Sequence, residues 1–450
     1  MPTLSEQLAA FGHDLSFEQI PDDVTSFAKL LVLDLLGVTL AAKTTEEWRV
    51  TLEACLILGG ASEGATLWGT GRKSTPQLAA LFNGTVAHAL ELDDFNGVDH
   101  SGAVVLPALF AAAEMRPEVT GAQFLTAMVY GYEVGRRLLD AAGGYRAHNE
   151  AGWHTTGTCG SFAAAAAVAK LWDLPPHEIT WALGEAGSFT GGVWAFSSDG
   201  AMSKRYHAGR AAETGLVAAT LASQGFTGPK EIFEARWGGY ANTYAAGKFD
   251  ADKMVSDLGQ DLRLGMAGIK PYACCRGLHS TVDAVLTMRS EPGFDPDAIG
   301  DVLVRCTPGQ AIQLGNGTPV TRLDAQFSLP YSFSVAAIKG RASLVEFSDL
   351  LDDEAIRKLA ARVRIQPEPD LGKEWEPELT VSLADGRVLT RQVKVALGDA
   401  RNPLPRAAVI DKYRGLMGLG GLQEGSADIE DITLGLEAPK ALRRLLTLLA

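Results

Sequence analysis

A long stretch rich in alanine and glycine, from residue 104 to residue 225, constrains the fold of this chain more than any other feature. Its runs of small side chains, such as residues 161–169, combine high helix propensity with room for helices to approach closely. The stretch therefore predicts a tightly packed all-helical domain.

The pattern before and after this stretch extends the helical domain and adds a second kind of structure. Apolar residues at helical spacing predict helices over residues 18–43, about 46–58 and 75–84, and again over most of 399–450. After about residue 266, alternating segments at 301–306 and 361–365 predict strands, and Asp385-Gly386 between 379–383 and 387–390 predicts a hairpin. Helical patterns at 333–338 and 353–360 make this part a mixed α+β unit.

These patterns predict a mainly α protein with a smaller α+β part. The first part of the helical domain covers residues 1–266, an α+β lid domain is inserted at 267–398, and residues 399–450 return to the helical domain. A small ligand is expected to bind in the cleft between two such domains.

Composition excludes several classes of protein. In 450 residues, 46% are apolar and 21% charged, which is ample for a large core, and the formal net charge of -14 argues against nucleic acid or an anionic membrane as partner. The start lacks the pattern of a signal peptide, and the apolar segments 30–40 and 163–169 are too short to span a bilayer. The five cysteines show no zinc-finger or disulfide spacing. We expect a cytoplasmic protein.

Residues 88–100 concentrate groups that exchange protons. Two imidazoles and four carboxylates lie between two predicted buried helices, namely His88, Glu91, Asp93, Asp94, Asp99 and His100. Burial and like-charge repulsion there raise the pKa of at least one carboxyl, which suits proton transfer. The alternative is that individual acids cap helices or pair with surface arginines.

A basic segment supplies the candidate anion site. Lys204, Arg205, His207 and Arg210 lie in a predicted polar loop, residues 197–210, that enters a helix at 211–223, where the helix dipole favours a carboxylate or phosphate. A solvated basic turn is the alternative. His154, just before the alanine-rich helix, either takes part in chemistry or bonds a backbone group.

Two segments of the predicted lid add further candidates. Lys270, Arg276 and His279 lie at the proposed hinge, and Tyr331 lies at the entry to a lid helix. All of them could be structural, and Cys274 and Cys275 are read as small core residues. A Gly-x-Ser-x-Gly pattern at 60–64 follows a predicted helix and not a strand, so it does not indicate a serine hydrolase.

The ordered segments together resemble the MmgE/PrpD family, which includes 2-methylcitrate dehydratase, cis-aconitate decarboxylase and iminodisuccinate epimerase. The resemblance spans nearly the whole chain. It is carried by residues 68–72, 79–84, 88–90, 93–94, 100–102, 106–108, 152–156, 204, 209–210, 225–229, 270–272, 274–276, 279 and 325–331.

The resemblance implies a helical domain with a lid, an active site between the two, a homodimer, and no metal or iron-sulfur cofactor. Carried over by motif, the catalytic candidates are Glu91, Asp93, His100, His154, Lys204, His279 and Tyr331. With the cations noted above, the substrate-binding candidates are Asp94, Arg205, His207, Arg210, Lys270 and Arg276. This chain departs from the family where Glu91 replaces the commoner aspartate and where residues 95–101 are shortened.

Family substrates are small di- or tricarboxylic acids, and the reactions break a bond beside a carboxylate. We therefore expect Lys204 and His279 to stabilise an enediolate, His154 to act as base, and Glu91 or His100 as acid; Tyr331 would hold a carboxylate or assist protonation. The first expectation is a cofactor-independent hydro-lyase. Carboxy-lyase and epimerase chemistry are the alternatives, and the rival of another class is a carboxylate-binding scaffold.

Overall fold

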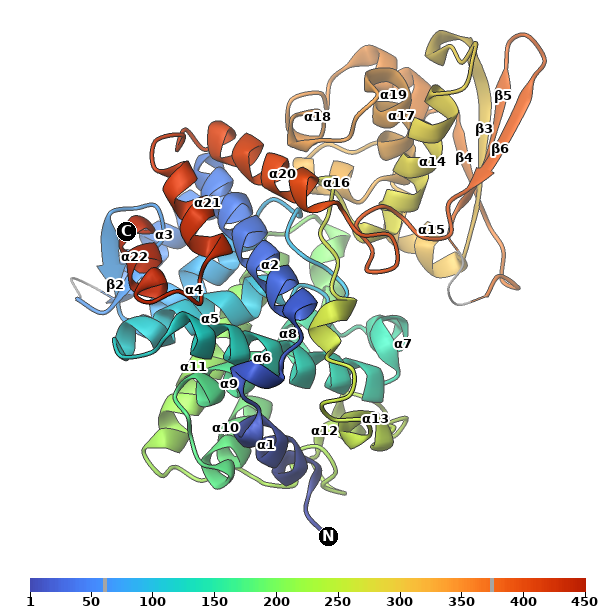
Figure 1. Ribbon diagram of the computed structural model, residues 1–450. Coiled ribbons are helices and arrows are strands. Elements are labelled where there is room, and N and C mark those ends of the chain that lie inside the picture. The colour runs from blue at the N-terminus through green and yellow to red at the C-terminus, as the bar shows by residue number, and fades with distance from the viewer. Residues whose placement is uncertain (60–62, 373–375) are drawn as a thin grey trace. The chain divides into compact units, whose positions relative to one another are not determined.

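The computed structural model describes residues 1–59, 63–372 and 376–450. The chain forms two compact units (Figure 1). The first contains Met1–Phe196, Ala201–Ile269 and Pro405–Ala450, and the second contains Ser197–Gly200 and Lys270–Leu404. The prediction of a mainly helical protein with a smaller α+β part is confirmed. The Gly-x-Ser-x-Gly pattern falls partly outside the described residues, although the segment before it is helical as expected.

The first unit is helical apart from one short two-stranded sheet. Its α-helices are α1 (Leu4–Asp14), α2 (Asp22–Ala41), α3 (Glu46–Gly59), α4 (Pro76–Ala87), α5 (Gly102–Met115), α6 (Gly121–Ala141), α7 (Gly144–Glu150), α8 (Thr155–Thr158), α9 (Gly160–Leu171), α10 (Pro176–Ser188), α11 (Ser203–Ser223), α12 (Tyr240–Thr243), α13 (Asp252–Val255), α20 (Arg406–Leu419), α21 (Ser426–Leu434) and α22 (Ala441–Leu448). The strands β1 (Ala65–Leu67) and β2 (Arg72–Ser74) pair antiparallel. Among the described residues, the 3-10 helices η1 (Phe17–Gln19), η2 (Ala42–Thr44) and η4 (Arg263–Met266) belong to this unit, and η3 (Trp194–Ser198) crosses from it into the second unit.

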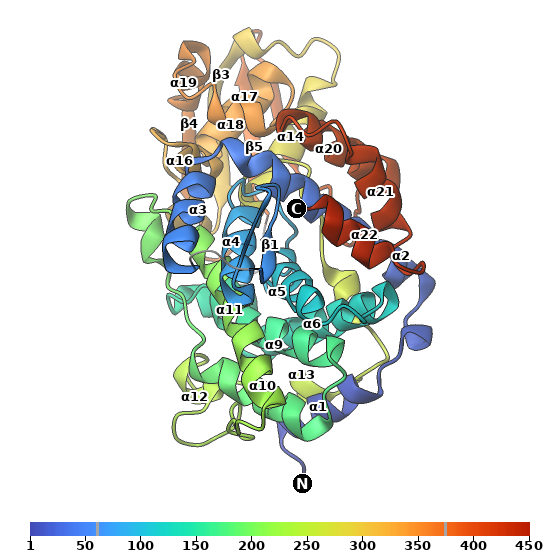
Figure 2. The same ribbon diagram turned by 90° about the vertical axis from the view of Figure 1, so that its left-hand side faces the viewer.

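Small residues bring the central helices of this unit into backbone contact, as their composition predicts. Helix α11 packs against α4, α5, α9 and α10 (Figure 2). A Cβ atom on Gly209 of α11 would lie 2.1 Å from the carbonyl oxygen of Leu81 in α4, and one on Gly84 would lie 2.8 Å from the Cα of Gly209. Only glycine fits at this crossing. It brings the end of α4 beside the start of α11, which is where the candidate site lies.

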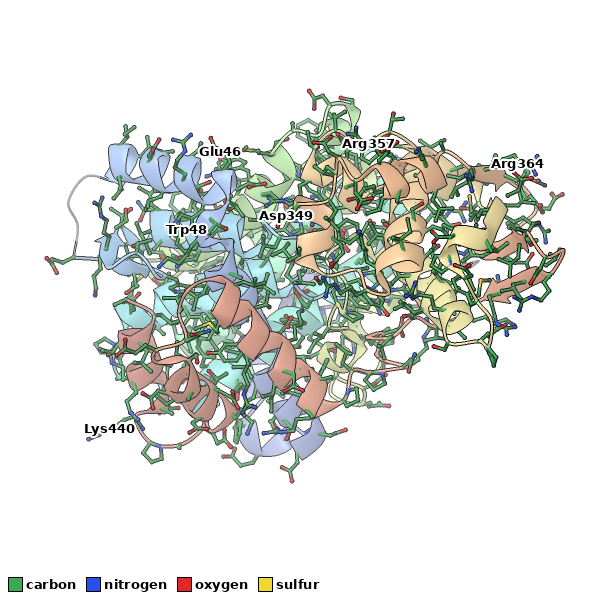
Figure 3. All side chains as sticks on the ribbon, turned by 90° about the horizontal axis from the view of Figure 1, so that it is seen from above. Glu46, Trp48, Asp349, Arg357, Arg364 and Lys440 are labelled. Atoms are coloured by element: carbon green, nitrogen blue, oxygen red, sulfur yellow. The ribbon has the colours of Figure 1, made fainter. Side chains whose placement is uncertain are left out.

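Aromatic side chains complete the packing around α4. Trp48 of α3 contacts Phe82 of α4 edge to face, with ring centroids 5.1 Å apart, and Trp48 is buried while Glu46 on the same helix is exposed (Figure 3). This inward and outward division is that of an amphipathic surface helix.

The long apolar helix α2 lies against the C-terminal helices α20 and α21 (Figure 1). By length and composition alone, the segment 22–44 is the one candidate for a membrane span among the described residues, with a mean hydropathy of 1.8. The sequence analysis therefore underestimated the length of this apolar helix when it judged residues 30–40 too short to span a bilayer. Because 78% of that apolar window is buried inside the unit, α2 is placed as a core helix.

Helix α11 begins earlier than the sequence predicted. Residues 203–210 were expected to be loop, but α11 starts at Ser203, so Lys204, Arg205, His207 and Arg210 lie within its first two turns. The expectation was wrong because polar character was taken as a sign of loop, whereas lysine and arginine are good helix formers.

The second unit is built on a four-stranded sheet of order β4-β3-β5-β6. Its strands are β3 (Ile299–Cys306), β4 (Val363–Pro367), β5 (Glu378–Leu383) and β6 (Val388–Gln392). Its helices are η5 (Arg276–Leu278), α14 (His279–Arg289), η6 (Pro296–Ala298), α15 (Pro308–Leu314), α16 (Arg322–Gln326), α17 (Leu329–Lys339), α18 (Leu344–Ser348) and α19 (Glu354–Ala360).

Sheet register follows the sequence pattern. Strands β5 and β6 pair antiparallel around Gly386, whose φ of 90° suits the predicted Asp-Gly turn. Strand β3 pairs antiparallel with β5 and parallel with β4, and from Val302 to Cys306 its buried residues alternate with partly exposed ones. Helices α14, α17 and α19 pack together in the same unit.

Candidate active site

The loop between α4 and α5 holds most of the candidate groups. His88 caps the end of α4, and the backbone of Glu91 has a φ of 55°, a left-handed conformation that is uncommon for a residue with a side chain. Asp94 Oδ1 accepts a hydrogen bond of 2.8 Å from the first backbone N–H of α5, at Gly102. The loop is therefore fixed at both ends by the helices that it joins. Strain at Glu91 is the kind found at functional positions.

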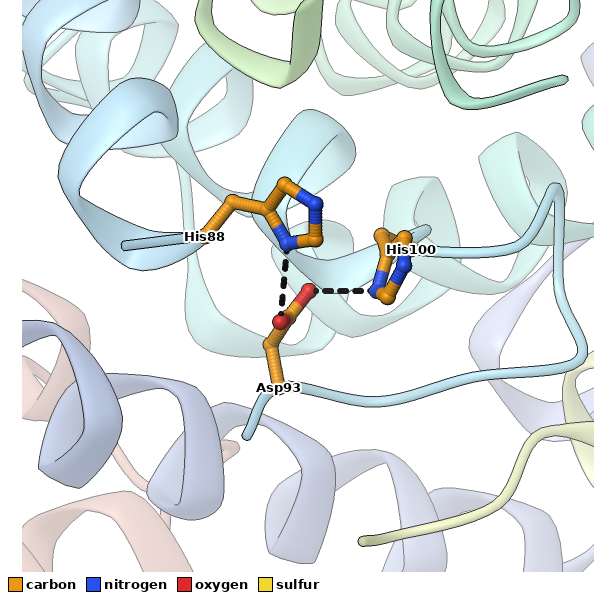
Figure 4. A group of neighbouring side chains, drawn as sticks. All are labelled: His88, Asp93 and His100. Atoms are coloured by element: carbon orange, nitrogen blue, oxygen red, sulfur yellow. Dashed lines mark hydrogen bonds and ion pairs between the residues drawn. The ribbon is translucent and has the colours of Figure 1, made fainter. Parts of the chain in front are cut away.

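Asp93 lies between two imidazoles (Figure 4). Its Oδ1 is 2.9 Å from His88 Nδ1, and its Oδ2 is 3.0 Å from His100 Nδ1. All three residues are buried. Burial alone would raise the pKa of Asp93, but the two imidazoles hold it well below its usual value. Asp93 is thus an ionised carboxylate that orients two rings.

Lys204 joins this group from the first turn of α11. Its Nζ donates to Glu91 Oε2 at 2.6 Å and lies 3.0 Å from His88 Nε2 and 3.5 Å from His100 Nε2. Arg205 also donates to Glu91 Oε2. Since an ammonium can only donate, His88 accepts at Nε2 and carries its proton on Nδ1, toward Asp93. Burial lowers the pKa of His88 well below its usual value, in agreement with a neutral ring.

The His88, Asp93 and His100 ligand atoms lie within 4.8 Å of one another, so their geometry alone would also suit a divalent cation. Two observations fit such an ion poorly. Hydrogen-bond distances already account for the approach of the carboxylate to both rings, and the Lys204 ammonium faces the other nitrogen of His88. A positive charge at that distance opposes a second cation.

His154 lies on the other side of His100, with ring centroids 6.5 Å apart. Its backbone N–H donates to the Gly192 carbonyl, and its Nδ1 is 2.9 Å from Nδ1 of His207 in α11. Its Nε2 is buried and, among the described residues, has no hydrogen-bond partner. Burial lowers the pKa of His154 well below its usual value. A neutral, buried imidazole with an unengaged nitrogen suits a general base.

Asp99 completes the group. Its backbone φ is 108°, and its Oδ2 lies 3.5 Å from His100 Nε2 and 3.8 Å from His154 Nε2. Neither Asp99 nor His88 was among the sequence-predicted catalytic or substrate-binding residues. The signal was present, because both belong to the same cluster of acids and imidazoles at residues 88–100.

Asp94 and Arg210 are placed differently from their predicted role in substrate binding. Asp94 Oδ2 accepts from the Tyr132 hydroxyl at 2.8 Å, and its other oxygen binds Gly102, so both oxygens are engaged within the unit. Burial raises the pKa of Asp94 well above its usual value, which confirms the prediction that one carboxyl of this stretch is so perturbed. The Arg210 side chain is 46% exposed and pairs with Glu213 at 2.7 Å.

The remaining candidates belong to the second unit. Lys270 is buried, and His279 Nε2 lies 3.3 Å from the Cys274 carbonyl oxygen. Tyr331 is buried and donates its hydroxyl to the Glu346 carbonyl at 2.7 Å, while Arg276 lies 3.1 Å from Glu376. The structure thus brings together, within the first unit, the predicted residues Glu91, Asp93, His100, His154, Lys204, Arg205 and His207.

This buried group of imidazoles, carboxylates and an ammonium, set in a helical unit, contains the proton donors, proton acceptors and positive charge that acid-base chemistry on an anion requires. The chain belongs to the MmgE/PrpD family: residues 6–252 match the MmgE/PrpD N-terminal domain and residues 272–437 the MmgE/PrpD C-terminal domain. The resemblance inferred from the sequence is therefore confirmed.

Relatives of known activity are similar over nearly their whole length. The cis-aconitate decarboxylase of Aspergillus terreus is 27% identical, with 99% of this chain and 96% of that protein covered. The cis-aconitate decarboxylases of Homo sapiens and Mus musculus are 26% and 25% identical, with 92% of this chain covered and 88% and 86% of theirs.

Proposed function

We propose that this protein is a lyase that acts on a small di- or tricarboxylic acid, and that its chemistry is loss of carbon dioxide. The observation that carries the proposal is the Lys204 ammonium, which is 1% exposed and lies within 3.5 Å of two imidazoles. A desolvated cation beside proton-carrying rings can hold an anion and help to supply a proton. The activity of the similar decarboxylases supports carboxy-lyase chemistry ahead of the hydro-lyase that the sequence first suggested.

The proposed mechanism uses the site as follows. When the bond between carbon and the departing carboxylate breaks, its electron pair stays on carbon and spreads toward a neighbouring carboxylate. Lys204 stabilises that charge, while Glu91, which also accepts a hydrogen bond from Arg205, holds the ammonium in place. A proton from an imidazole, His100 or His154, then completes the product at carbon. The sequence-based hypothesis made His154 a base. In decarboxylation the same ring would act as a proton donor, because the last step adds a proton to carbon.

Dehydration is the second candidate, and the neutral His154 ring favours it. A base with an unengaged, buried nitrogen is suited to removing a proton beside a carboxylate, which is the first step of dehydration and also of epimerisation. Departure of hydroxide then requires an acid, for which the sequence-based candidates are His100 and Glu91, 3.7 Å apart between Nε2 and Oε1. A carboxylate-binding scaffold without turnover is the rival from another class.

The oligomeric state, the cellular location and the partners of the protein are also proposals. We expect a homodimer, a cytoplasmic location, and neither nucleic acid nor membrane as partner, which family resemblance and the net charge of -14 support. His279, Tyr331, Lys270 and Arg276 are proposed to serve the same reaction on the basis of the family motif. Mass measurement in solution tests the dimer.

The experiment is incubation of metal-free protein with citrate, 2-methylcitrate, cis-aconitate, malate, tartrate and iminodisuccinate, followed by proton NMR in deuterium oxide. Carbon dioxide loss supports the first candidate. New alkene signals without it indicate dehydration, and deuterium at the α carbon alone indicates epimerisation. No turnover together with thermal stabilisation by one acid would contradict a lyase and favour the scaffold.

A further inference from the structure

The contact between His154 and His207 requires a proton between two ring nitrogens. The two rings meet through Nδ1 atoms 2.9 Å apart. A hydrogen bond between two such nitrogens needs one proton, so one ring donates and the other accepts. If both rings are neutral, the tautomer of one is therefore set by the tautomer of the other.

The surroundings favour a pair of neutral rings. His154 is fully buried, and the Trp194 and Phe196 rings lie edge-on to it at 5.3 and 5.6 Å. Burial and the positive charge of Lys204 together lower the pKa of His207 to about 4, and the same two causes lower the pKa of His154 well below its usual value. The other titratable groups facing the pair are His100, His88 and Asp99, and Asp99 Oδ2 lies 3.8 Å from His154 Nε2.

His207 is fixed in place for this contact. It projects from α11, and the Gly192 backbone lies so close that a Cβ atom there would be 3.3 Å from the His207 ring. The same Gly192 supplies the carbonyl that binds the His154 backbone N–H at 3.0 Å. One glycine segment therefore holds both rings at hydrogen-bond distance.

We infer that His207 is a positioning residue that sets the tautomer of His154 and exchanges its proton with solvent. With the shared proton on His154 Nδ1, His154 Nε2 presents a lone pair and acts as base. With that proton on His207 Nδ1, His154 Nε2 carries a proton and acts as acid. This inference rests on the proposed proton-transfer function and assigns His207 a role other than substrate binding.

The exchange of protons between the substrate, the two rings and water leaves both rings neutral. When His154 Nε2 gains a proton from the substrate, His154 Nδ1 gives its proton to His207 Nδ1, and His207 Nε2 releases one to water. Delivery of a proton to the substrate runs the same steps in reverse. His207 is partly exposed, whereas His154 is fully buried, so His207 is the ring of the pair that water reaches.

The first test needs no substrate. Nitrogen-15 NMR of histidine-labelled protein at neutral pH, with His154 assigned by loss of its signals in His154→Asn, reports the tautomer of His154. We expect His207→Leu to shift both His154 nitrogen signals. His177→Leu is the matched control, because the His177 side chain is 61% exposed and outside the site. Unchanged His154 signals in folded His207→Leu would overturn the inference, whatever the enzyme's activity.

The second test uses whichever acid the wild-type protein turns over. His207→Leu should lower kcat about 100-fold, in the range of general acid-base effects, with KM changed less than about threefold. In His207→Ala, added imidazole should restore part of the lost rate by exchanging the proton. Failure of imidazole to restore any rate would overturn the exchange with solvent, and an unchanged kcat in both variants would overturn the positioning role.

Discussion

Lys412 in α20 forms a largely buried ion pair, and we expect the removal of Lys412 alone to destabilise the first unit strongly. Its Nζ lies 2.7 Å from Asp34 Oδ1 in α2 and donates to the Leu92 carbonyl at 2.9 Å. Asp34 is 1% exposed, and burial raises its pKa even with Lys412 present. Lys412→Met would therefore leave an uncompensated carboxyl in the core.

Removal of one partner from a buried pair costs about 3–5 kcal/mol in the free energy of unfolding, and we expect that cost for Lys412→Met at pH 7.5. A group whose pKa is higher in the folded than in the unfolded state binds more protons when folded, so its penalty grows as pH rises through that interval. The loss should accordingly be smaller at pH 5 than at pH 7.5. Asp34→Leu combined with Lys412→Met should recover most of it.

Urea denaturation, followed by circular dichroism at both pH values, measures these differences in the free energy of unfolding for wild type, Lys412→Met, the double variant and a control. Lys29→Met is the matched control, because Lys29 also joins α2 to the C-terminal segment, through a partly exposed pair with Glu437 at 2.8 Å. We expect about 1 kcal/mol or less there. A loss below 1 kcal/mol for Lys412→Met, or a double variant as unstable as the single one, would refute the reasoning.

Three further predictions concern the site. His154→Ala should lower kcat by about 100-fold or more, with a melting temperature within a few degrees of wild type; unimpaired turnover would remove His154 from the mechanism. Lys204→Met should lower kcat/KM by about 100- to 1,000-fold, and Lys170→Met, which removes a lysine bonded to the distant His13 carbonyl, should not. Dialysis against a chelator should leave activity unchanged, because His88 is hydrogen-bonded to Asp93, His100 Nδ1 lies at hydrogen-bond distance from the Asp94 carbonyl, and the Lys204 ammonium faces His88. Loss of activity that Zn²⁺ or Mn²⁺ restores would contradict this.

The sequence predicted those parts of the fold that depend on residues close together in the chain. The hairpin at Asp385-Gly386 follows from turn geometry, and the helical unit follows from small side chains that allow Gly84 and Gly209 to meet. The start of α11 was missed because a run of polar residues has no apolar period to mark it. Family resemblance, and not spacing, selected most of the site candidates.

Contacts within the site depended on the fold and could not be predicted from spacing. Glu91 and Lys204 are 113 residues apart in sequence, and nothing local indicates that Lys204 also faces His88. The hydrogen bond from Tyr132 to Asp94 could not be predicted either, because a tyrosine in the middle of a largely buried helix indicates packing and no particular partner. The pairing of His154 with His207 required the positions of α8 and α11.

The return of the chain to its first unit has a consequence for synthesis in the cell. Lys412 lies 320 residues after the Leu92 carbonyl that it binds. At about 5–20 residues per second, roughly 15–60 seconds pass between the emergence of the two from the ribosome. During that time the apolar face of α2 that α20 later covers is exposed to water. Chaperones that bind exposed apolar surface are expected to bind it. Assembly of the helical unit is therefore completed only after α20 has been synthesised.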